Sequence, residues 1–145
     1  MSLRAYAPDD DRLRELLASW RTIAVIGLSP DPWRPSFGVA RYLIDAGYDV
    51  IPVHPDAQEV LGRTAYPALA DIERPIDCVD VFRRPEFTPE HAREAVKAGA
   101  RALWLQEGIV NHEAREIAEA AGLDVIMGLC IKTVHRWLRP EEESA

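Results

Sequence analysis

The chain has 145 residues, of which 48% are hydrophobic and 28% are charged, and its net charge is −7 at pH 7. This length predicts a single domain over residues 1–145 with a sizeable buried core. The negative charge argues against nucleic acid as a partner, and no apolar run is long enough to span a membrane.

Helix and strand signals alternate in the first half of the chain. They predict, in order, a helix over Asp9–Ser19, a strand over Ile23–Leu28, a helix from near Ser36 to just before Gly47, and a strand over Asp49–Val53. The following stretch, "EVLGRTAYPAL", is rich in turn residues, and its proline requires a non-helical conformation at Tyr66.

The alternation continues to the end. The second half predicts a strand over Asp77–Phe82, a helix from Thr88 to just before Gly99, a strand over Ala102–Gln106, a helix from Asn111 to just before Gly122, a strand over Val125–Met127, and a helix over about Thr133–Leu138. Thr88 and Asn111 are expected to cap their helices. An acidic tail over about residues 140–145 is expected to fray.

One unit recurs three times, as "DAGYDVIPV", "KAGARALWL" and "AAGLDVIMG". In each, a helical pattern ends at Ala-Gly and an apolar run follows, which is typical of a strand buried between two helix layers. The sequence therefore predicts an α/β, Rossmann-like, doubly wound sheet of about five parallel strands with helices on both faces. Such sheets bind ligands beyond the carboxyl ends of the strands, where the strand order reverses.

The first loop at that edge, "GLSPDPWRPS", contains prolines where a dinucleotide-binding turn would contain further glycines. The helix that follows offers unpaired N–H groups to an anion. Ser29 and Ser36 could add hydroxyl donors, and Arg34 a guanidinium. Equally, Ser36 could be a plain helix cap, and Gly27 could serve only close packing of strand and helix.

Further polar residues follow the later strands. "FRRP" places Arg83 and Arg84 at the ligand-bearing edge, and only one of them is expected to face the crevice, since adjacent residues point opposite ways; both could instead be solvated. "LQEG" places Gln106 there as a candidate polar contact. Asp80 interrupts a buried strand and needs a partner, such as a backbone N–H or an arginine.

Conventional catalytic sets are missing from the sequence, which favours a binding protein over an enzyme. There is neither a nucleophile elbow nor a Walker P-loop. Val53-His54-Pro55 closes the second strand where a dehydrogenase holds an acidic residue, and this weakens an NAD-dependent reading.

Several motifs, taken in order, resemble the single-domain CoA-binding proteins, small relatives of the CoA-binding domain of the succinyl-CoA synthetase α-subunit. They are "VIGLSPDPWRPSFGVARYL", "VIPVHP", "EVLGRTAYPAL", "VDVFRRPE" and "LWLQEGIVN", within about Arg21 to Leu138. The resemblance implies that coenzyme A is held by Gly27, Leu28, Ser29, Arg34, Pro35, Ser36, Val53, His54, Pro55, Phe82, Arg83, Arg84 and Gln106. His54 departs from the family, in which asparagine is usual, and "MGLCIK" is less polar than usual.

The resemblance implies a non-catalytic protein that binds coenzyme A or acyl-CoA. The pyrophosphate and the 3′-phosphate of coenzyme A need two anion sites. The first would lie at the helix start near Ser36, and the second would come from Arg34, Arg83 or Arg84. An NAD(P)-binding redox protein and a partner-dependent component of an acyl-CoA ligase stay open as alternatives, and so does any protein partner.

The two cysteines, Cys78 and Cys130, form no metal-binding spacing, and no secretory leader is visible, so we expect a reducing cytoplasm. Cys130 follows the last strand, and Lys132, a further candidate ligand contact, could favour its thiolate. A mixed disulfide with the CoA thiol is then conceivable, although a cysteine that fills the core is the simpler reading.

Overall fold

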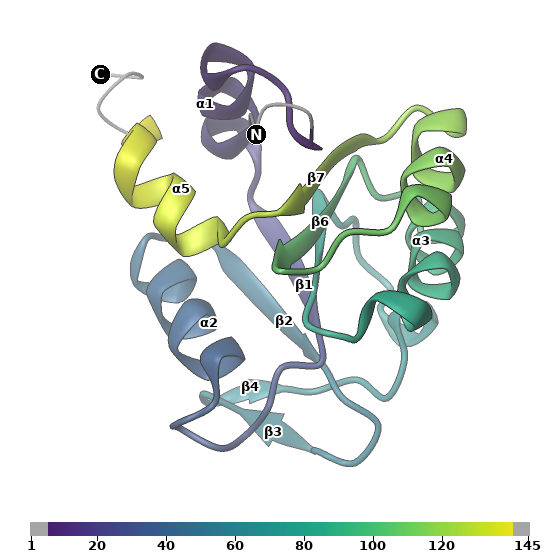
Figure 1. The fold of residues 1–145 in the computed structure, drawn as a ribbon. Coiled ribbons are helices and arrows are strands. Elements are labelled where there is room, and N and C mark those ends of the chain that lie inside the picture. Colours follow the sequence, from purple (N-terminus) through teal and green to yellow (C-terminus); the bar gives the residue numbers. More distant parts are fainter. Residues whose placement is uncertain (1–5, 141–145) are drawn as a thin grey trace.

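Five parallel strands form the central sheet of the computed structural model, which describes residues 6–140 (Figure 1). They are β1 (Thr22–Ile26), β2 (Asp49–Val53), β5 (Cys78–Val81), β6 (Ala102–Glu107) and β7 (Asp124–Gly128). Their order across the sheet is β2-β1-β5-β6-β7, so the chain reverses direction of winding between β1 and β5. The prediction of a Rossmann-like, doubly wound sheet of five parallel strands is confirmed.

Helices cover both faces of this sheet, as Figure 1 shows. They are α1 (Asp10–Ser19), α2 (Pro35–Asp45) and α5 (Ile131–Leu138) on one face, and α3 (Thr88–Lys97) and α4 (His112–Ala120) on the other. Each layer buries its own hydrophobic cluster against the strands, which explains why the strand sequences are apolar on both faces. Within residues 6–140, no helix has the length and apolarity that crossing a bilayer requires.

The helix-ending signals behave as the sequence predicts. Gly47, Gly99 and Gly122 follow α2, α3 and α4 and all have positive φ. The Asn111 side chain accepts a hydrogen bond from the Ala114 N–H at 2.8 Å and so caps α4. These local signals set the three repeated helix-to-strand connections.

Two helix starts differ from the sequence prediction. Thr88 does not cap α3; it is the first residue of that helix, and its hydroxyl donates to the Pro85 carbonyl at 2.7 Å. A short 3₁₀ turn, η3 (Pro85–Phe87), precedes it and takes the place of a cap. The last helix begins at Ile131 instead of Thr133, because Cys130 already occupies the cap position. The other element ends differ by at most two residues, and residues 141–145 of the acidic tail lie outside the described part of the chain.

The turn-rich insert contains a hairpin that the sequence did not reveal. Strands β3 (Glu59–Val60) and β4 (Arg63–Thr64) pair antiparallel around Leu61 and Gly62, both with positive φ, as a two-residue hairpin requires. A short 3₁₀ turn, η2 (Leu69–Asp71), follows. Between them Tyr66 bridges to Val53 and is non-helical, as predicted. The insert therefore supports the residues that follow β2.

A buried polar pair lies between the neighbouring strands β5 and β6. Gln106 donates from its side-chain amide to Oδ1 of Asp80, and both residues are buried. The partner of Asp80 is thus neither a backbone N–H nor an arginine. Oδ2 of Asp80 has no hydrogen-bond partner among the described residues. Burial raises the pKa of Asp80 to about 7, and the hydrogen bond from Gln106 opposes that rise.

This pKa makes stability depend on pH. Because the folded pKa of Asp80 lies above the reference value of 3.8, its protonated form favours the folded state, and this contribution is lost as the pH rises through about 7. Asparagine stays neutral at every pH. The difference in free energy of unfolding between Asp80→Asn and the natural protein should therefore shift in favour of the variant by roughly 2–3 kcal/mol as the pH is raised from about 5 to about 8.5. Urea unfolding across this range measures the effect, with the exposed Asp45→Asn as control. If the free energy of unfolding of Asp80→Asn depended on pH in the same way as that of the natural protein, the raised pKa of Asp80 would be contradicted.

Candidate functional site

A cavity of about 490 Å³ opens at the carboxyl edge of the sheet, where the strand order reverses. Three connections line it: the β1–α2 loop, the residue after β2 and the residue after β5. The lining residues are Gly27, Ser29, Pro30, Asp31, Arg34, Pro35, Ser36, His54 and Phe82. The cavity therefore lies at the edge and at the switch point that the fold class predicts for a ligand.

Gly27 brings the ends of three strands together beneath this cavity. Its φ is +83°, and a Cβ atom there would overlap the carbonyl oxygen of Phe82. Its N–H donates to the Val53 carbonyl at 3.0 Å, and the N–H of Phe82 donates to the Ile26 carbonyl at 2.9 Å. Only glycine fits this backbone conformation and this close approach.

Two serines fix the conformation of the β1–α2 loop. The Ser29 N–H donates to Oγ of Ser36 at 3.0 Å, and the Asp31 N–H donates to Oγ of Ser29 at 3.1 Å. Since both hydroxyl oxygens accept from the backbone, their own hydrogens remain as donors. Ser36 is the second residue of α2, and the cap position belongs to Arg34, so the interpretation of Ser36 as a helix cap is wrong.

His54 is held in one tautomer by the backbone that follows it. Its Nδ1 accepts from the N–H groups of Asp56 and Ala57, both at 3.1 Å, so Nδ1 carries no proton and Nε2 carries the hydrogen. An asparagine could accept the same two hydrogen bonds through its side-chain oxygen. Histidine can therefore take the place of the asparagine that is usual in the family that the sequence resembles. The ring contributes a further N–H donor to the cavity lining.

The polar lining consists mainly of donors. Besides the two serine hydroxyls and the His54 Nε2–H, the donors include the N-terminal end of α2 and the guanidinium of Arg34. Arg34 has no ion pair within the described part of the chain. Both the helix end and the guanidinium favour negative charge. Asp31 is the one carboxylate in the lining and can accept from a ligand hydroxyl or amine. The arrangement suits an anionic ligand that also carries donor groups.

Arg83 and Arg84 lie beside the cavity and are not part of its lining. Their guanidinium carbons lie 5.0 and 5.7 Å from the centroid of the Phe87 ring, so both cations approach one aromatic side chain. The stem of Arg83 also runs along Gly27, where its Cδ would be 3.3 Å from an added Cβ. Arg83 is half-buried and Arg84 is exposed. Arg83 is therefore the arginine nearer to the strand ends.

Several candidate residues from the sequence are not brought to the cavity. Leu28, Val53 and Gln106 are buried, at 0%, 5% and 3% exposure, and the amide of Gln106 is used by Asp80. Pro55 is exposed beside His54. The ammonium group of Lys132 lies 5.8 Å from the Tyr42 ring centroid, on the side where α2 and α5 meet. Conversely, Pro30 and Asp31 line the cavity although neither was named as a ligand contact from the sequence. The prolines of the loop were noticed there, and for Asp31 the carboxylate within the loop was the available signal.

The two cysteines occupy different environments. Cys130 is partly buried against the core cluster at the start of α5 and does not line the cavity. Cys78 is fully buried, and burial, then the negative charges of Asp80 and Asp77, raise the pKa of its thiol. Cys78 is therefore protonated and unreactive at neutral pH.

Comparisons with known proteins place these features in a family. A sequence model described as a CoA binding domain matches residues 21–136. The chain is 44% identical over 128 residues to the "uncharacterized protein YneT" of Bacillus subtilis, covering 88% of this chain and 95% of that protein. A solved structure, a hypothetical protein from Pyrococcus horikoshii, is 40% identical with a TM-score of 0.88 and covers 90% and 92% of the two chains. An ADP-forming acetate–CoA ligase of Archaeoglobus fulgidus is 26% identical over 101 residues, which are 68% of this chain and only 15% of the ligase.

Because Gly27 lies against the Phe82 carbonyl, even a small side chain at this position should lower the stability of the fold. Gly27→Ala should lower the free energy of unfolding by at least about 2 kcal/mol, because it adds both an unfavourable φ and an overlap with the Phe82 carbonyl. Gly38→Ala is the matched control, since Gly38 lies within α2 with open space around it, and alanine there should stabilise the helix by about 0.5–1 kcal/mol. If urea unfolding gave the same change in free energy of unfolding for Gly27→Ala and Gly38→Ala, the proposed role of Gly27 would be contradicted.

Proposed function

Because this chain belongs to the CoA-binding domain family, we propose that it binds coenzyme A, free or acylated, in the cavity at the carboxyl edge of its sheet. The observation that carries the proposal is the donor-rich lining at the start of α2, in a family defined by this ligand. The chain acts as a binding protein with no chemical step of its own. Both cysteines are free thiols, which suits the reducing cytoplasm as its location.

The chemistry of coenzyme A matches the two groups of cations and donors. The start of α2 with Ser29, Ser36 and Arg34 would hold one phosphate-bearing part of the ligand. Arg83, whose side chain runs along Gly27, would hold a second. Since Val53 is buried, the exposed Pro55 is the better candidate to pack against the adenine ring. Asp31 would accept from a hydroxyl group of the ligand.

A partner-dependent role in acyl-CoA formation is the second candidate, favoured by the similarity to ADP-forming acetate–CoA ligase. The chain spans only 15% of that ligase, so the remaining functions would have to come from another polypeptide. Formation of acyl-CoA from acid, nucleotide and CoA by the purified chain alone would contradict the non-catalytic proposal. An NAD(P)-dependent redox role is less well supported, because His54 offers a donor where a ribose diol needs an acceptor.

The cavity should prefer coenzyme A to the dinucleotides. Calorimetric titration of the purified chain with CoA, NAD and NADP should give an affinity for CoA at least about tenfold higher than for either dinucleotide. For NAD the physical reason is that the end of β2 carries no carboxylate to hold the ribose diol. For NADP the expectation rests on the family to which the chain belongs. An affinity for NAD or NADP equal to that for CoA would contradict the assignment.

Two arginines should contribute to the binding of coenzyme A. Arg34→Ala should weaken CoA binding by roughly 1.5–3 kcal/mol, about 10–150-fold, if its guanidinium makes a charge-assisted hydrogen bond to phosphate. Arg83→Ala should have an effect of the same order. Arg93→Ala on α3 is the control, because Arg93 pairs with Glu90 on the far face of the sheet and should leave binding unchanged. If Arg34→Ala and Arg83→Ala both bind CoA as tightly as the natural protein, the phosphate contacts lie elsewhere.

A further inference from the structure

The four tryptophans of the chain form two pairs with different environments. Trp20 and Trp104 are buried, and their rings meet edge to face with centroids 6.2 Å apart. Trp33 and Trp137 are 80% and 69% exposed, so neither contributes much to the core. Single exposed apolar side chains are common on soluble proteins. Trp33 is distinguished by its position in the loop that lines the cavity.

Trp33 occupies the third position of a tight turn in the β1–α2 loop. The Arg34 N–H donates to the Asp31 carbonyl at 3.1 Å and closes the turn around the two residues between them. Pro32 takes the second position, which favours proline because the φ angle required there is the one that proline already has. The start of the turn is anchored as well, since the Asp31 N–H donates to Oγ of Ser29 at 3.1 Å. The backbone of Trp33 is therefore held in place before a ligand binds.

The cavity lining adjoins Trp33 on both sides along the chain. Asp31 and Arg34, the first and last residues of the turn, line the cavity, whereas Pro32 and Trp33 are exposed at its tip. The indole is not part of the lining, and within residues 6–140 it forms neither a hydrogen bond nor a contact with another ring. Trp33 thus offers a large aromatic ring at the edge of the cavity, where a ligand that extends beyond the cavity can contact it.

The covalent structure of coenzyme A indicates which part of the ligand the indole can reach. One ribose joins the adenine ring to the pyrophosphate and carries the 3′-phosphate. With phosphates held at the start of α2 and at Arg34, the adenine ring lies one ribose away from them. Neighbouring Cα atoms are only about 3.8 Å apart, so the side chain of Trp33 can span that distance. The pantetheine arm has no flat ring, whereas the adenine offers a flat face to an aromatic side chain.

We propose that Trp33 stacks on the adenine ring of the bound coenzyme A. This inference rests on the proposed function and adds a contact that lies outside the lining of the cavity. Phe82 and His54 also carry aromatic rings at the cavity, but both are half-buried, and Phe82 packs against the core. Pro55, exposed after the neighbouring strand β2, would contact the same ring from the other side of the cavity.

The fixed turn makes this stacking favourable. Because the backbone of Trp33 is already held, only the two side-chain torsions of the indole lose freedom when the adenine binds. Stacking of a base on an aromatic side chain contributes measurably to affinity even where no hydrogen bond is made. A tryptophan that the fold leaves exposed therefore gains its main contact from the ligand.

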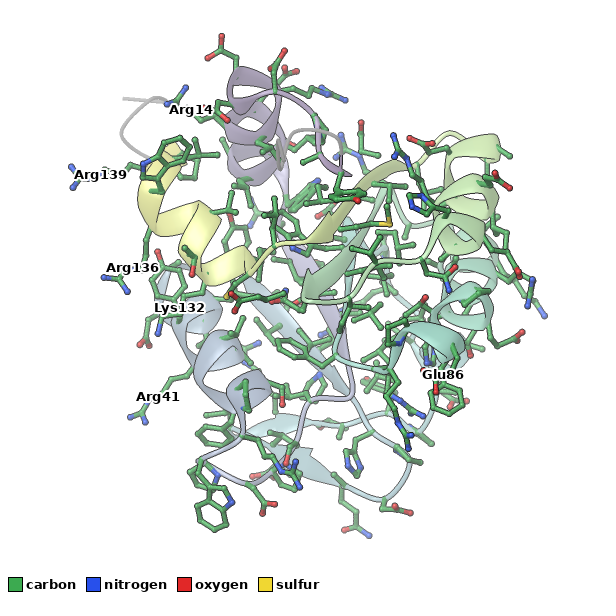
Figure 2. All side chains as sticks on the ribbon, in the orientation of Figure 1. Arg14, Arg41, Glu86, Lys132, Arg136 and Arg139 are labelled. Carbon is green, nitrogen blue, oxygen red and sulfur yellow. The ribbon has the colours of Figure 1, made fainter. Side chains whose placement is uncertain are left out.

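Trp137 provides a matched control for Trp33. Its side chain is also exposed, but it belongs to α5. Figure 2 shows Arg136, the residue before it, pointing outward above α2, whereas the β1–α2 loop lies at the lower end of α2. Removal of the Trp137 indole therefore tests what the loss of an exposed tryptophan does away from the cavity.

The experiment combines calorimetric titration with tryptophan fluorescence, because an adenine stacked on an indole quenches its emission. The ligands are coenzyme A, adenosine 3′,5′-bisphosphate, which lacks the pantetheine arm, and 4′-phosphopantetheine, which lacks the adenine. In the natural chain the first two should quench the emission and the third should not.

The variants identify the indole that is responsible. Trp33→Ala should weaken the binding of coenzyme A about five- to fiftyfold and remove the quenching. Trp33→Phe keeps a smaller ring, so it should retain most of the affinity while losing the quenching. Trp137→Ala should bind coenzyme A as tightly as the natural chain and should keep the quenching. Urea unfolding of each variant checks that it is folded.

Three outcomes would overturn the proposal. If the natural chain and Trp33→Ala bind coenzyme A equally tightly, the proposed function stands but the indole does not contact the ligand; a loss of self-association in sedimentation of Trp33→Ala would then identify a surface for a second copy of the chain. If 4′-phosphopantetheine quenches the emission and adenosine 3′,5′-bisphosphate does not, the indole contacts the pantetheine arm. If the natural chain binds no coenzyme A in calorimetry, the proposed function fails and the stacking fails with it.

Discussion

The close packing of β1 against β5 at Gly27 is the constraint on which the site depends. The sheet reverses its winding at this point, and the absent side chain lets the end of β1 lie against the Phe82 carbonyl. The hydrogen bonds from Gly27 to Val53 and from Phe82 to Ile26 then fix three strand ends in one arrangement. The positions of the β1–α2 loop, of His54 and of Phe82 around the cavity follow from that arrangement.

A proline-rich loop replaces the glycine-rich turn that dinucleotide-binding proteins use at this edge. The Ser29 and Ser36 hydroxyls hold the loop by accepting from its backbone N–H groups, and Pro30 and Pro35 restrict its φ angles. The loop therefore presents side-chain donors beside the backbone N–H groups at the start of α2. A loop fixed in this way loses little conformational entropy when a ligand binds, which favours affinity.

The elements of the fold were predictable from the sequence because their signals are local. The three Ala-Gly helix ends and the Asn111 cap act within a few residues, and strand–helix alternation then implies a parallel sheet. The site was predictable as a set of loops, because the carboxyl edge is where such sheets bind ligands. Individual side chains were less predictable, because their partners are distant in sequence.

Particular residues show where local reasoning ends. The side chain of Gln106 contacts Asp80, 26 residues earlier, and no sequence pattern links them. Lys132 follows β7 at the ligand-bearing edge, yet its ammonium group lies over Tyr42 of another helix. The β3–β4 hairpin has strands of two residues, too short for an alternating pattern to be visible.

Amide NMR of the chain during titration with coenzyme A tests the central claim most directly, because it reports on every loop at once. The account predicts that the largest shift changes occur at Ser29, Ser36 and His54 and in the first turn of α2, with the amides of α3 and α4 unchanged. Changes centred on α3 and α4, or no change at saturating coenzyme A, would contradict it.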